Sequence, residues 1–190
     1  MIKIGILALQ GDFEKHSQMM ALLGHQTLFV RTKAQLQSCA GLIIPGGEST
    51  TLAKLMKKHD LWEPVRQFSR EKPVFGTCAG LIVLAKKAVR NNVETLGLID
   101  IQVVRNAYGR QVDSFIDDVT LKLCENELTF EGVFIRAPKI VSLGSGVVPL
   151  AWHGDDIVMA EQGNVLVAAF HPELTSDTKV HEYFAKKMHE

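Results

Sequence analysis

The stretch PVFGTCAGL, residues 73–81, decides the fold of this 190-residue sequence. A short apolar run leads into Gly-x-Cys-x-Gly, and a second apolar run follows. This pattern predicts a buried strand, a sharp turn that carries Cys78, and a helix over residues 79–88. The flanking glycines, Gly76 and Gly80, permit a tight turn and close packing of the helix on the strand. Because a helix N-terminus stabilises an anion, Cys78 is predicted to be an activated nucleophile. The alternative is a buried, inert cysteine in a tight turn.

The rest of the first half repeats this alternation of strand and helix. Strands are expected at residues 2–9, 27–30, 41–45 and 73–76. Helices are expected before Gly24, from Ser49 or Thr50 as the N-cap, at 61–70 and at 79–88. Such alternation predicts a parallel sheet with helices on both faces.

The second half changes to strands joined by turns. These are expected at residues 98–104, 119–123, 133–135 and 157–161, before an apolar strand at 165–170 and a final helix at 180–188. We therefore predict an α/β fold, a three-layer sandwich. Its central sheet is mostly parallel, with a small mixed or antiparallel portion in the second half. One domain spanning residues 1–190 is the simplest organisation.

Composition narrows the class of function. The chain is 46% hydrophobic and 22% charged, with 21 basic and 21 acidic residues, which is typical of a globular protein. A net charge of zero argues against nucleic acid and membrane surfaces as partners. The apolar N-terminal run is too short to span a membrane. The cytoplasm is therefore the expected location.

Three cysteines, Cys39, Cys78 and Cys124, are scattered along the chain with no Cys-x-x-Cys pair. Such spacing favours neither a zinc site nor a disulfide framework, so we expect a reducing compartment. Cys39 and Cys124 lack the context of Cys78 and are predicted to be structural or surface residues.

A nucleophilic thiol needs a base, and His171 is the best placed of seven histidines. The other six lie in helical stretches or polar turns and are expected to be solvated: His16, His25, His59, His153, His181 and His189. His171 ends an apolar strand, where active sites of parallel sheets gather. Pro172 disfavours helical geometry before it, so His171 and Glu173 should project to the same side of an extended segment. Cys78, His171 and Glu173 are thus predicted to be nucleophile, base and orienting carboxylate. A strand-terminal turn with a solvated glutamate is the alternative.

Such a site also needs donors for an oxyanion. We expect the N–H of Ala79, directly after the nucleophile, and one from the Gly-Gly pair at residues 46–47, most plausibly Gly47. A phosphate-binding loop is the alternative for this pair, but both usual glycine patterns of such loops are missing.

Several motifs together extend the argument to a family. They are LQG at residues 9–11, PGGESTT at 45–51, GTCAGL at 76–81, RNAYGRQ at 105–111, IRAP at 135–138 and FHPEL at 170–174. The sequence resembles the class I glutamine amidotransferases with a Cys-His-Glu triad. Within them it resembles the glutaminase subunits of pyridoxal 5′-phosphate synthases, over nearly its whole length.

The resemblance implies a flavodoxin-like fold and the hydrolysis of L-glutamine to L-glutamate and ammonia, with no cofactor and no metal in this chain. It implies a (β/α)8-barrel synthase subunit as the partner that consumes the ammonia. By the same resemblance Gln10 lies near the oxyanion loop. The implied glutamine contacts are Gly47, Glu48, Ser49, Arg105, Ile135 and Arg136.

Three alternatives stay open at this point. A glutaminase subunit for imidazole glycerol phosphate synthesis usually has other residues after the cysteine and a lysine after His-Pro-Glu, where this chain has Leu174. A catalytically silent homologue is disfavoured by the intact triad. A cysteine peptidase would need a long peptide groove, for which the sequence gives no sign.

Overall fold

The computed structural model describes residues 3–89, 93–105, 114–123 and 127–189. Five parallel strands form one part of a nine-stranded sheet, in the order β2 (Gln26–Val30), β1 (Lys3–Leu7), β3 (Gly41–Ile44), β4 (Val74–Thr77) and β12 (Val165–Ala168). Strands β3, β4 and β12 are buried at every position. Burial on both faces explains why they read as continuous apolar runs.

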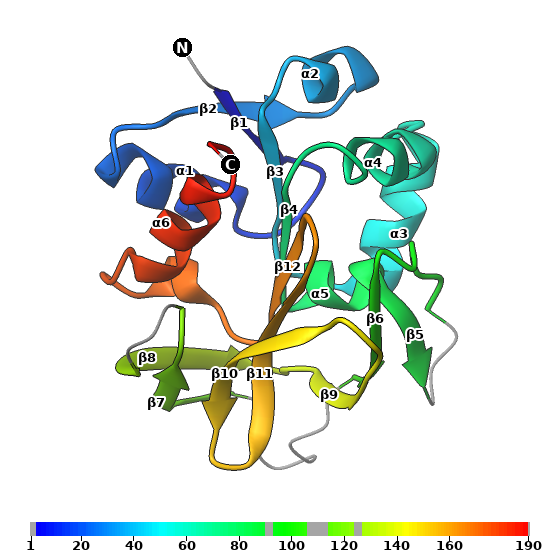
Figure 1. Cartoon of the computed structure of the whole chain (residues 1–190). Helices are drawn as coiled ribbons and strands as arrows, with labels where there is room; N and C mark the ends of the chain where they lie inside the picture. The colour runs from blue at the N-terminus through cyan, green and yellow to red at the C-terminus, as the bar shows by residue number, and fades with distance from the viewer. Residues whose placement is uncertain (1–2, 90–92, 106–113, 124–126, 190) are drawn as a thin grey trace.

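Helices cover both faces of this parallel part. Figure 1 shows α1 (Phe13–Leu22) and α6 (Lys179–Lys186) on one side. The opposite side carries α3 (Ser49–Lys58), α4 (Trp62–Phe68) and α5 (Ala79–Leu84), and the short α2 (Lys33–Gln37) lies near β2. The predicted three-layer α/β arrangement is confirmed.

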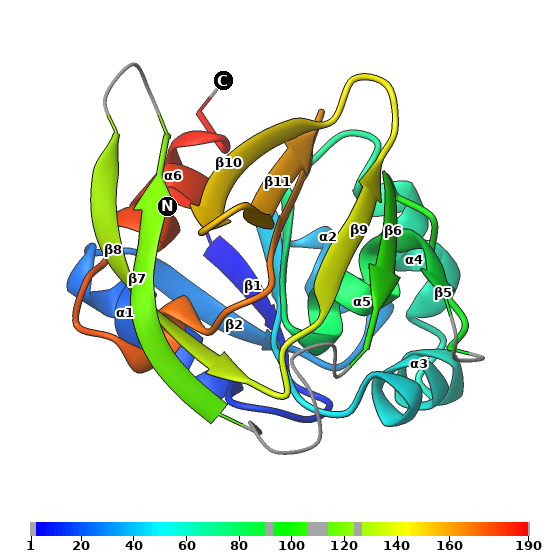
Figure 2. The same ribbon diagram turned by 90° about the horizontal axis from the view of Figure 1, so that it is seen from below.

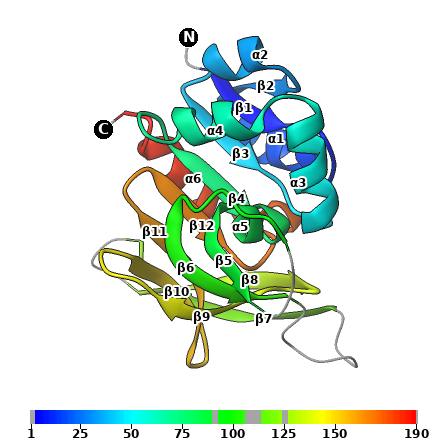
Figure 3. The same cartoon turned by 90° about the vertical axis from the view of Figure 1, so that its right-hand side faces the viewer.

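The antiparallel portion continues the same sheet. Beyond β12 it adds β11 (Asp156–Gln162), β10 (Val148–His153), β7 (Ser114–Leu121) and β8 (Leu128–Ile135), all paired antiparallel. Figure 3 shows α2 and β2 at one end of the molecule and β7, β8 and β10 at the other. The far end of the sheet is thus built by the second half of the chain, as expected.

A separate small sheet lies beside α5. It consists of β5 (Ala85–Val89), β6 (Ile99–Val104) and β9 (Lys139–Leu143), which Figure 2 shows side by side. Its strand β5 corrects the prediction of one helix over residues 79–88. Helix α5 ends at Leu84, because residues 85–89 pair in parallel with β6 instead of continuing the helix. Tertiary pairing overrides the high helix propensity of Ala and Lys, which occupy residues 85–88.

Local details of other elements differ from expectation. The N-cap of α3 is Glu48 and not Ser49 or Thr50, because the Glu48 carboxylate accepts hydrogen bonds from the Thr50 and Thr51 N–H groups. Strands β7 and β8 are longer than the predicted segments, and β9 and β10 were not predicted. In the described ranges, no helix is long and apolar enough to cross a membrane.

The turn between β4 and α5 depends on two glycines that have no room for a side chain. A Cβ on Gly80 would lie 2.2 Å from the Ile44 carbonyl oxygen, and one on Gly76 would lie 2.6 Å from Leu84 Cδ1. Real Cβ atoms essentially never approach so closely. Helix α5 therefore sits directly on the carboxyl ends of β3 and β4, with all six of its residues buried.

We expect Gly80→Ala to lower the free energy of unfolding by about 3 kcal/mol, since α5 must move off the backbone of β3. Chemical denaturation followed by circular dichroism measures this loss. Gly163→Ala is the control, because Gly163 has φ +55° and no neighbour within 4 Å. The left-handed backbone alone costs about 1 kcal/mol there. Equal losses in the two variants would contradict the close-packing argument.

Candidate active site

Cys78 lies in a strained turn at the carboxyl end of β4. Its φ of +48° and ψ of −100° are rare for a residue with a side chain, and it is the N-cap of α5. Its N–H donates to the Ala168 carbonyl oxygen at 2.9 Å, which fixes the turn to β12. The side chain is buried, with 6% of the residue exposed. Strain of this kind gathers at functional sites and requires firm surrounding structure.

His171 and Glu173 follow β12 and form the predicted pair. The two side chains are joined by a hydrogen bond of 2.8 Å between His171 Nδ1 and Glu173 Oε1. The prediction of an extended backbone between them is wrong. The chain instead forms a 3-10 turn at Pro172–Leu174. Proline favours this first-turn position, because its φ is already suitable and its missing N–H is not needed. The turn brings the two side chains together by curling the chain.

The charges of this pair follow from burial and mutual contact. Burial alone would lower the pKa of His171, but the neighbouring Cys78 and Glu173 side chains raise it to about 10. Burial would raise the pKa of Glu173, but His16 and His171 together hold it at about 2. At neutral pH the site therefore contains a carboxylate next to an imidazolium.

Cys78 and His171 meet across Gly46. A Cβ on Gly46 would lie 2.5 Å from His171 Cε1 and 3.3 Å from Cys78 Cβ, so only glycine leaves room for both. The Cys78 thiol points to the Ile135 carbonyl oxygen at 3.7 Å. His171 Nε2 is buried and has no hydrogen-bond partner of ordinary geometry within the described ranges. Since Nδ1 is held by Glu173, Nε2 is the nitrogen left to exchange a proton with the thiol.

A cavity of about 190 Å³ opens at this point. It lies at the carboxyl ends of β3 and β4, the edge where open parallel sheets bind ligands. Its lining holds two predicted triad members and all six predicted glutamine contacts: Cys78, His171, Gly47, Glu48, Ser49, Arg105, Ile135 and Arg136. Three further lining residues were not predicted, namely Gly11, Asp12 and Ile82, whereas Gly46 belongs to the Gly-Gly pair expected beside the oxyanion. Segments far apart in the sequence therefore converge on one small chamber.

The rim of the cavity carries both signs of charge. Arg105 Nη2 donates to Glu48 Oε1 at 2.8 Å, and Arg105 Nη1 donates to Thr50 Oγ1 at 3.2 Å. Partial burial raises the pKa of Glu48, but hydrogen bonds from Thr51 and Thr50 lower it to about 2. The buried Ser49 hydroxyl has no partner within the described part of the chain. These groups are available to recognise a small polar molecule.

The predicted oxyanion residues take two different places. Ala79 is the first residue of α5, where N–H groups are free of intrahelical bonds. Gly47 has a φ of +132°, which residues with side chains rarely adopt. Gln10 does not line the cavity. Its Nε2 donates to the Glu48 carbonyl oxygen at 2.8 Å, and its amide packs against Gly47, so it holds the loop in place.

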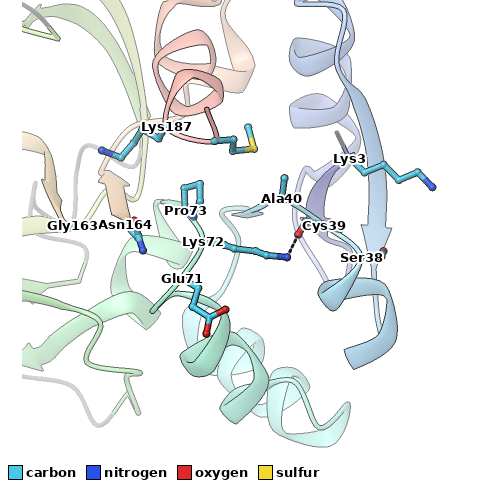
Figure 4. Close-up of a pocket in the computed structure, with 11 residues that line it drawn as sticks. Lys3, Ser38, Cys39, Ala40, Glu71, Lys72, Pro73, Gly163, Asn164 and Lys187 are labelled. Atoms are coloured by element: carbon cyan, nitrogen blue, oxygen red, sulfur yellow. Dashed lines mark hydrogen bonds between the residues drawn. The ribbon is translucent and has the colours of Figure 1, made fainter. Parts of the chain in front are cut away.

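A larger cavity of about 530 Å³ lies at the amino ends of the parallel strands. Figure 4 shows it among residues that precede the parallel strands, including Ala40, Pro73 and Asn164. Its cysteine, Cys39, is buried and donates to the Gln35 carbonyl oxygen, and Lys72 Nζ donates to the Cys39 carbonyl oxygen at 2.7 Å. The described residues that line it include no histidine. We therefore place the chemistry in the smaller cavity.

Two of the histidines predicted to be solvated are fully buried. His16 on α1 and His181 on α6 have no exposed surface. His16 lies beside Glu173, and His181 lies beside His16. The signal was present in the sequence. His16 shares a helical face with Met19 and Met20, and His181 shares one with Phe184 and Ala185.

Some predicted features lie outside the described residues, namely Cys124 and positions 106–111 of the RNAYGRQ motif. In the described ranges, no group of three or more His, Cys, Asp or Glu side chains is arranged to hold a metal ion.

Known proteins share both the sequence and the fold. The model of the SNO glutamine amidotransferase family matches residues 6–190. "Pyridoxal 5′-phosphate synthase subunit PdxT" of Thermosipho africanus is 51% identical over 96% of this chain and 97% of its own length. The protein of the same name from Pelotomaculum thermopropionicum is 49% identical over 98% of this chain and 95% of its own.

A solved structure described as a glutamine amidotransferase is 44% identical, with a TM-score of 0.92 over 98% of this chain and 99% of that one. Family model, relatives and structure agree over almost the full length. The chain therefore belongs to the SNO glutamine amidotransferase family.

Proposed function

We propose that this chain is the glutaminase subunit of a pyridoxal 5′-phosphate synthase and hydrolyses L-glutamine to L-glutamate and ammonia. The observation that carries the proposal is the cavity in which Cys78 and His171 lie beside charged residues suited to an amino acid. The names of the relatives at about 50% identity support the pathway. They also favour this assignment over imidazole glycerol phosphate synthesis.

The charges at the rim suit the two ends of free glutamine. Arg105 and Arg136 supply positive charge for the α-carboxylate, and the Glu48 carboxylate supplies negative charge for the α-ammonium. A cavity of about 190 Å³ suits one small amino acid better than the extended chain of a peptide. This size argues against the peptidase alternative.

Catalysis begins from the ion pair in which the proton of Cys78 lies on His171 Nε2, and the Cys78 thiolate attacks the side-chain amide carbon of glutamine. The carbon–sulfur bond forms, and negative charge collects on the amide oxygen, where the N–H groups of Ala79 and Gly47 stabilise it. The carbon–nitrogen bond then breaks, and His171 Nε2 gives its proton to the leaving nitrogen, which departs as ammonia. A γ-glutamyl thioester remains on Cys78.

Water completes the cycle. His171, now neutral, takes a proton from the water that attacks the thioester carbon, and the thiolate of Cys78 leaves as glutamate is released. Glu173 keeps the imidazole oriented through Nδ1 and stabilises its positive charge in both halves. No step requires a metal or an organic cofactor.

The ammonia needs a consumer, because it protonates and diffuses away in water. We propose that the partner is a (β/α)8-barrel synthase subunit that takes up the ammonia, and that the pair acts in the cytoplasm. Scattered, unpaired cysteines suit that compartment; Cys39 and Cys78 are both free thiols in the structure.

We expect Cys78→Ala to abolish glutamine hydrolysis and leave the fold intact, since it removes the nucleophile and only a sulfur atom's volume. Glutamate release and circular dichroism measure the two properties. Cys39→Ala is the matched control, a buried cysteine away from the cavity, and its rate should stay within a small factor of wild type. Activity near wild type in Cys78→Ala would refute the proposed function.

We expect Glu173→Gln to shift the alkaline limb of the pH profile of kcat/KM to lower pH by about one unit or more. The pKa of His171 is raised to about 10 partly by the Glu173 carboxylate, so the neutral amide lets the imidazolium lose its proton earlier. One unit corresponds to about 1.4 kcal/mol. Glu182→Gln is the control, the same change at an exposed position of α6. An alkaline limb that stays in place would contradict the role of Glu173.

We expect weak glutaminase activity from this chain alone and marked activation by the synthase. Gly47 has a backbone conformation that glycine adopts easily, so a peptide flip beside it can withdraw an oxyanion donor. Losing one donor costs roughly 10²–10³ in rate, which partner docking beside the loop can restore. Steady-state glutamate release with and without the synthase measures this, with Cys78→Ala plus synthase as background. Equal rates in both conditions would exclude the gate.

A further inference from the structure

Behind the triad lies a buried pair of histidines with no part in the mechanism above. His16 on α1 and His181 on α6 are both 0% exposed, and His16 Nδ1 lies 2.9 Å from His181 Nε2. The pair joins helices from opposite ends of the chain, which Figure 1 shows side by side on one face of the sheet. Burying two imidazoles is unfavourable unless their nitrogens are hydrogen-bonded.

The second nitrogen of His16 faces the triad. His16 Nε2 lies 3.4 Å from Glu173 Oε2 and 3.2 Å from Thr77 Oγ1. The other oxygen of the same carboxylate, Oε1, accepts from His171. One buried carboxylate therefore lies between two histidines, and Oε2 has no hydrogen bond of ordinary geometry in the described ranges. A buried anion needs such a donor.

Burial also fixes the charge state of the pair. It lowers the pKa of His16, and the charges of Glu173 and Asp12, which raise it, do not compensate for burial and for the charge of His171. It lowers the pKa of His181 to about 3. Both rings are therefore neutral near pH 7, and each carries one N–H.

The two ring protons of His16 and His181 have two possible placements, and the surroundings favour one of them. If His181 Nε2–H donates to His16 Nδ1, then His16 Nε2 carries a proton, which Thr77 Oγ1 accepts at 3.2 Å and which lies 3.4 Å from Glu173 Oε2 as the alternative acceptor, and His181 Nδ1 is a bare acceptor. In the reverse placement a lone pair of His16 faces the carboxylate, and His181 Nδ1–H becomes a buried donor. His181 Nδ1 has no partner within the described part of the chain. Orphaned donors are rarer than orphaned acceptors, so the first placement is favoured.

We propose that His16 is a positioning residue that donates a hydrogen bond from Nε2 to Glu173 Oε2, with its tautomer set by His181. The proposal rests on the proposed function, since it assigns His16 a role through Glu173. A carboxylate held at both oxygens cannot rotate, so it presents Oε1 to His171 in a fixed direction. The 3.4 Å separation is long for a hydrogen bond, as catalytic contacts often are before substrate binds.

Two variants of His16 separate its two nitrogens. The amide nitrogen of glutamine can occupy the place of Nε2, so His16→Gln keeps the donor to Glu173. The shorter His16→Asn reaches only the place of Nδ1 and removes that donor. The exposed His189→Asn is the control for the substitution itself.

Glutaminase activity is measured with the synthase present, over a range of pH. We expect His16→Asn to lower kcat roughly tenfold or more, with KM for glutamine within about twofold of wild type. The acid limb of kcat/KM should move to higher pH by about one unit or more, because a carboxylate that loses a donor has a higher pKa. In His16→Gln, kcat and the position of the acid limb should both be much closer to wild type. An acid limb that stays in place in His16→Asn overturns the proposal.

A double-mutant cycle identifies the partner of His16. In a Glu173→Gln background, His16→Asn should have almost no further effect on kcat or on the acid limb. A full effect in that background means that His16 acts through Thr77 or through packing, which also overturns the proposal. Thr77→Val, nearly equal in volume, should leave the acid limb in place.

Two further measurements keep the test decisive. Thermal unfolding identifies variants that fail to fold, and if His16→Asn is one of them, His181→Asn replaces it in the same cycle, with a smaller shift in the same direction expected. No shift in that variant overturns the proposal as well. If Cys78→Ala retains activity, the proposed function itself fails; if Cys78 is essential and the acid limb does not move, only the role of His16 fails.

Discussion

The close approach of α5 to the ends of β3 and β4 is the constraint on which the site depends. Gly76 and Gly80 leave no space for side chains there, so the chain must turn within a few residues and Cys78 must take a left-handed conformation. Strain of this kind costs about 1–3 kcal/mol. The burial of every residue of α5 offsets it. The same turn makes Cys78 the N-cap residue of α5, so the close packing of the fold also sets the position of the thiol.

A second constraint is the negative charge of Glu173 in the interior. A lone buried carboxylate would become protonated, because burial raises its pKa. Contacts with His16 and His171 reverse this and hold the pKa at about 2. The charge of Glu173 in turn contributes to the raised pKa of His171. The carboxylate is therefore the group that needs support and, in the proposed mechanism, the group that keeps His171 protonated for ammonia to leave.

Short sequence patterns were sufficient to predict the elements that form from neighbouring residues. The strand, elbow and helix around Cys78, the alternation of the first half and the His171–Glu173 pair all follow from short patterns, and the structure contains them. Pairing partners are not local, which is why the helix predicted over residues 79–88 ends at Leu84 and the segment from Ala85 forms β5 instead. The burial of His16 and His181 also depends on what packs against their helices. Both lie on apolar helical faces, so the helical periodicity indicates burial. The prediction that they are solvated follows from the polarity of histidine alone and is wrong.

The edge strand β8, which the second half of the chain contributes, lies against the site. β8 is the last strand of the nine, so among the described residues one of its edges has no strand partner. Carbonyl groups of alternate residues in a strand point to the same edge. Here the Val133 carbonyl accepts the His171 N–H at 2.8 Å, and the Ile135 carbonyl accepts the Cys78 thiol at 3.7 Å. An exposed strand edge invites pairing with other chains, but this edge contacts Cys78 and His171. Arg136 follows directly with φ +44°, so the strand that contacts these two residues also carries part of the cavity rim. The antiparallel extension thus joins the cavity rim to Cys78 and His171 through backbone contacts, which need no particular side chain on β8.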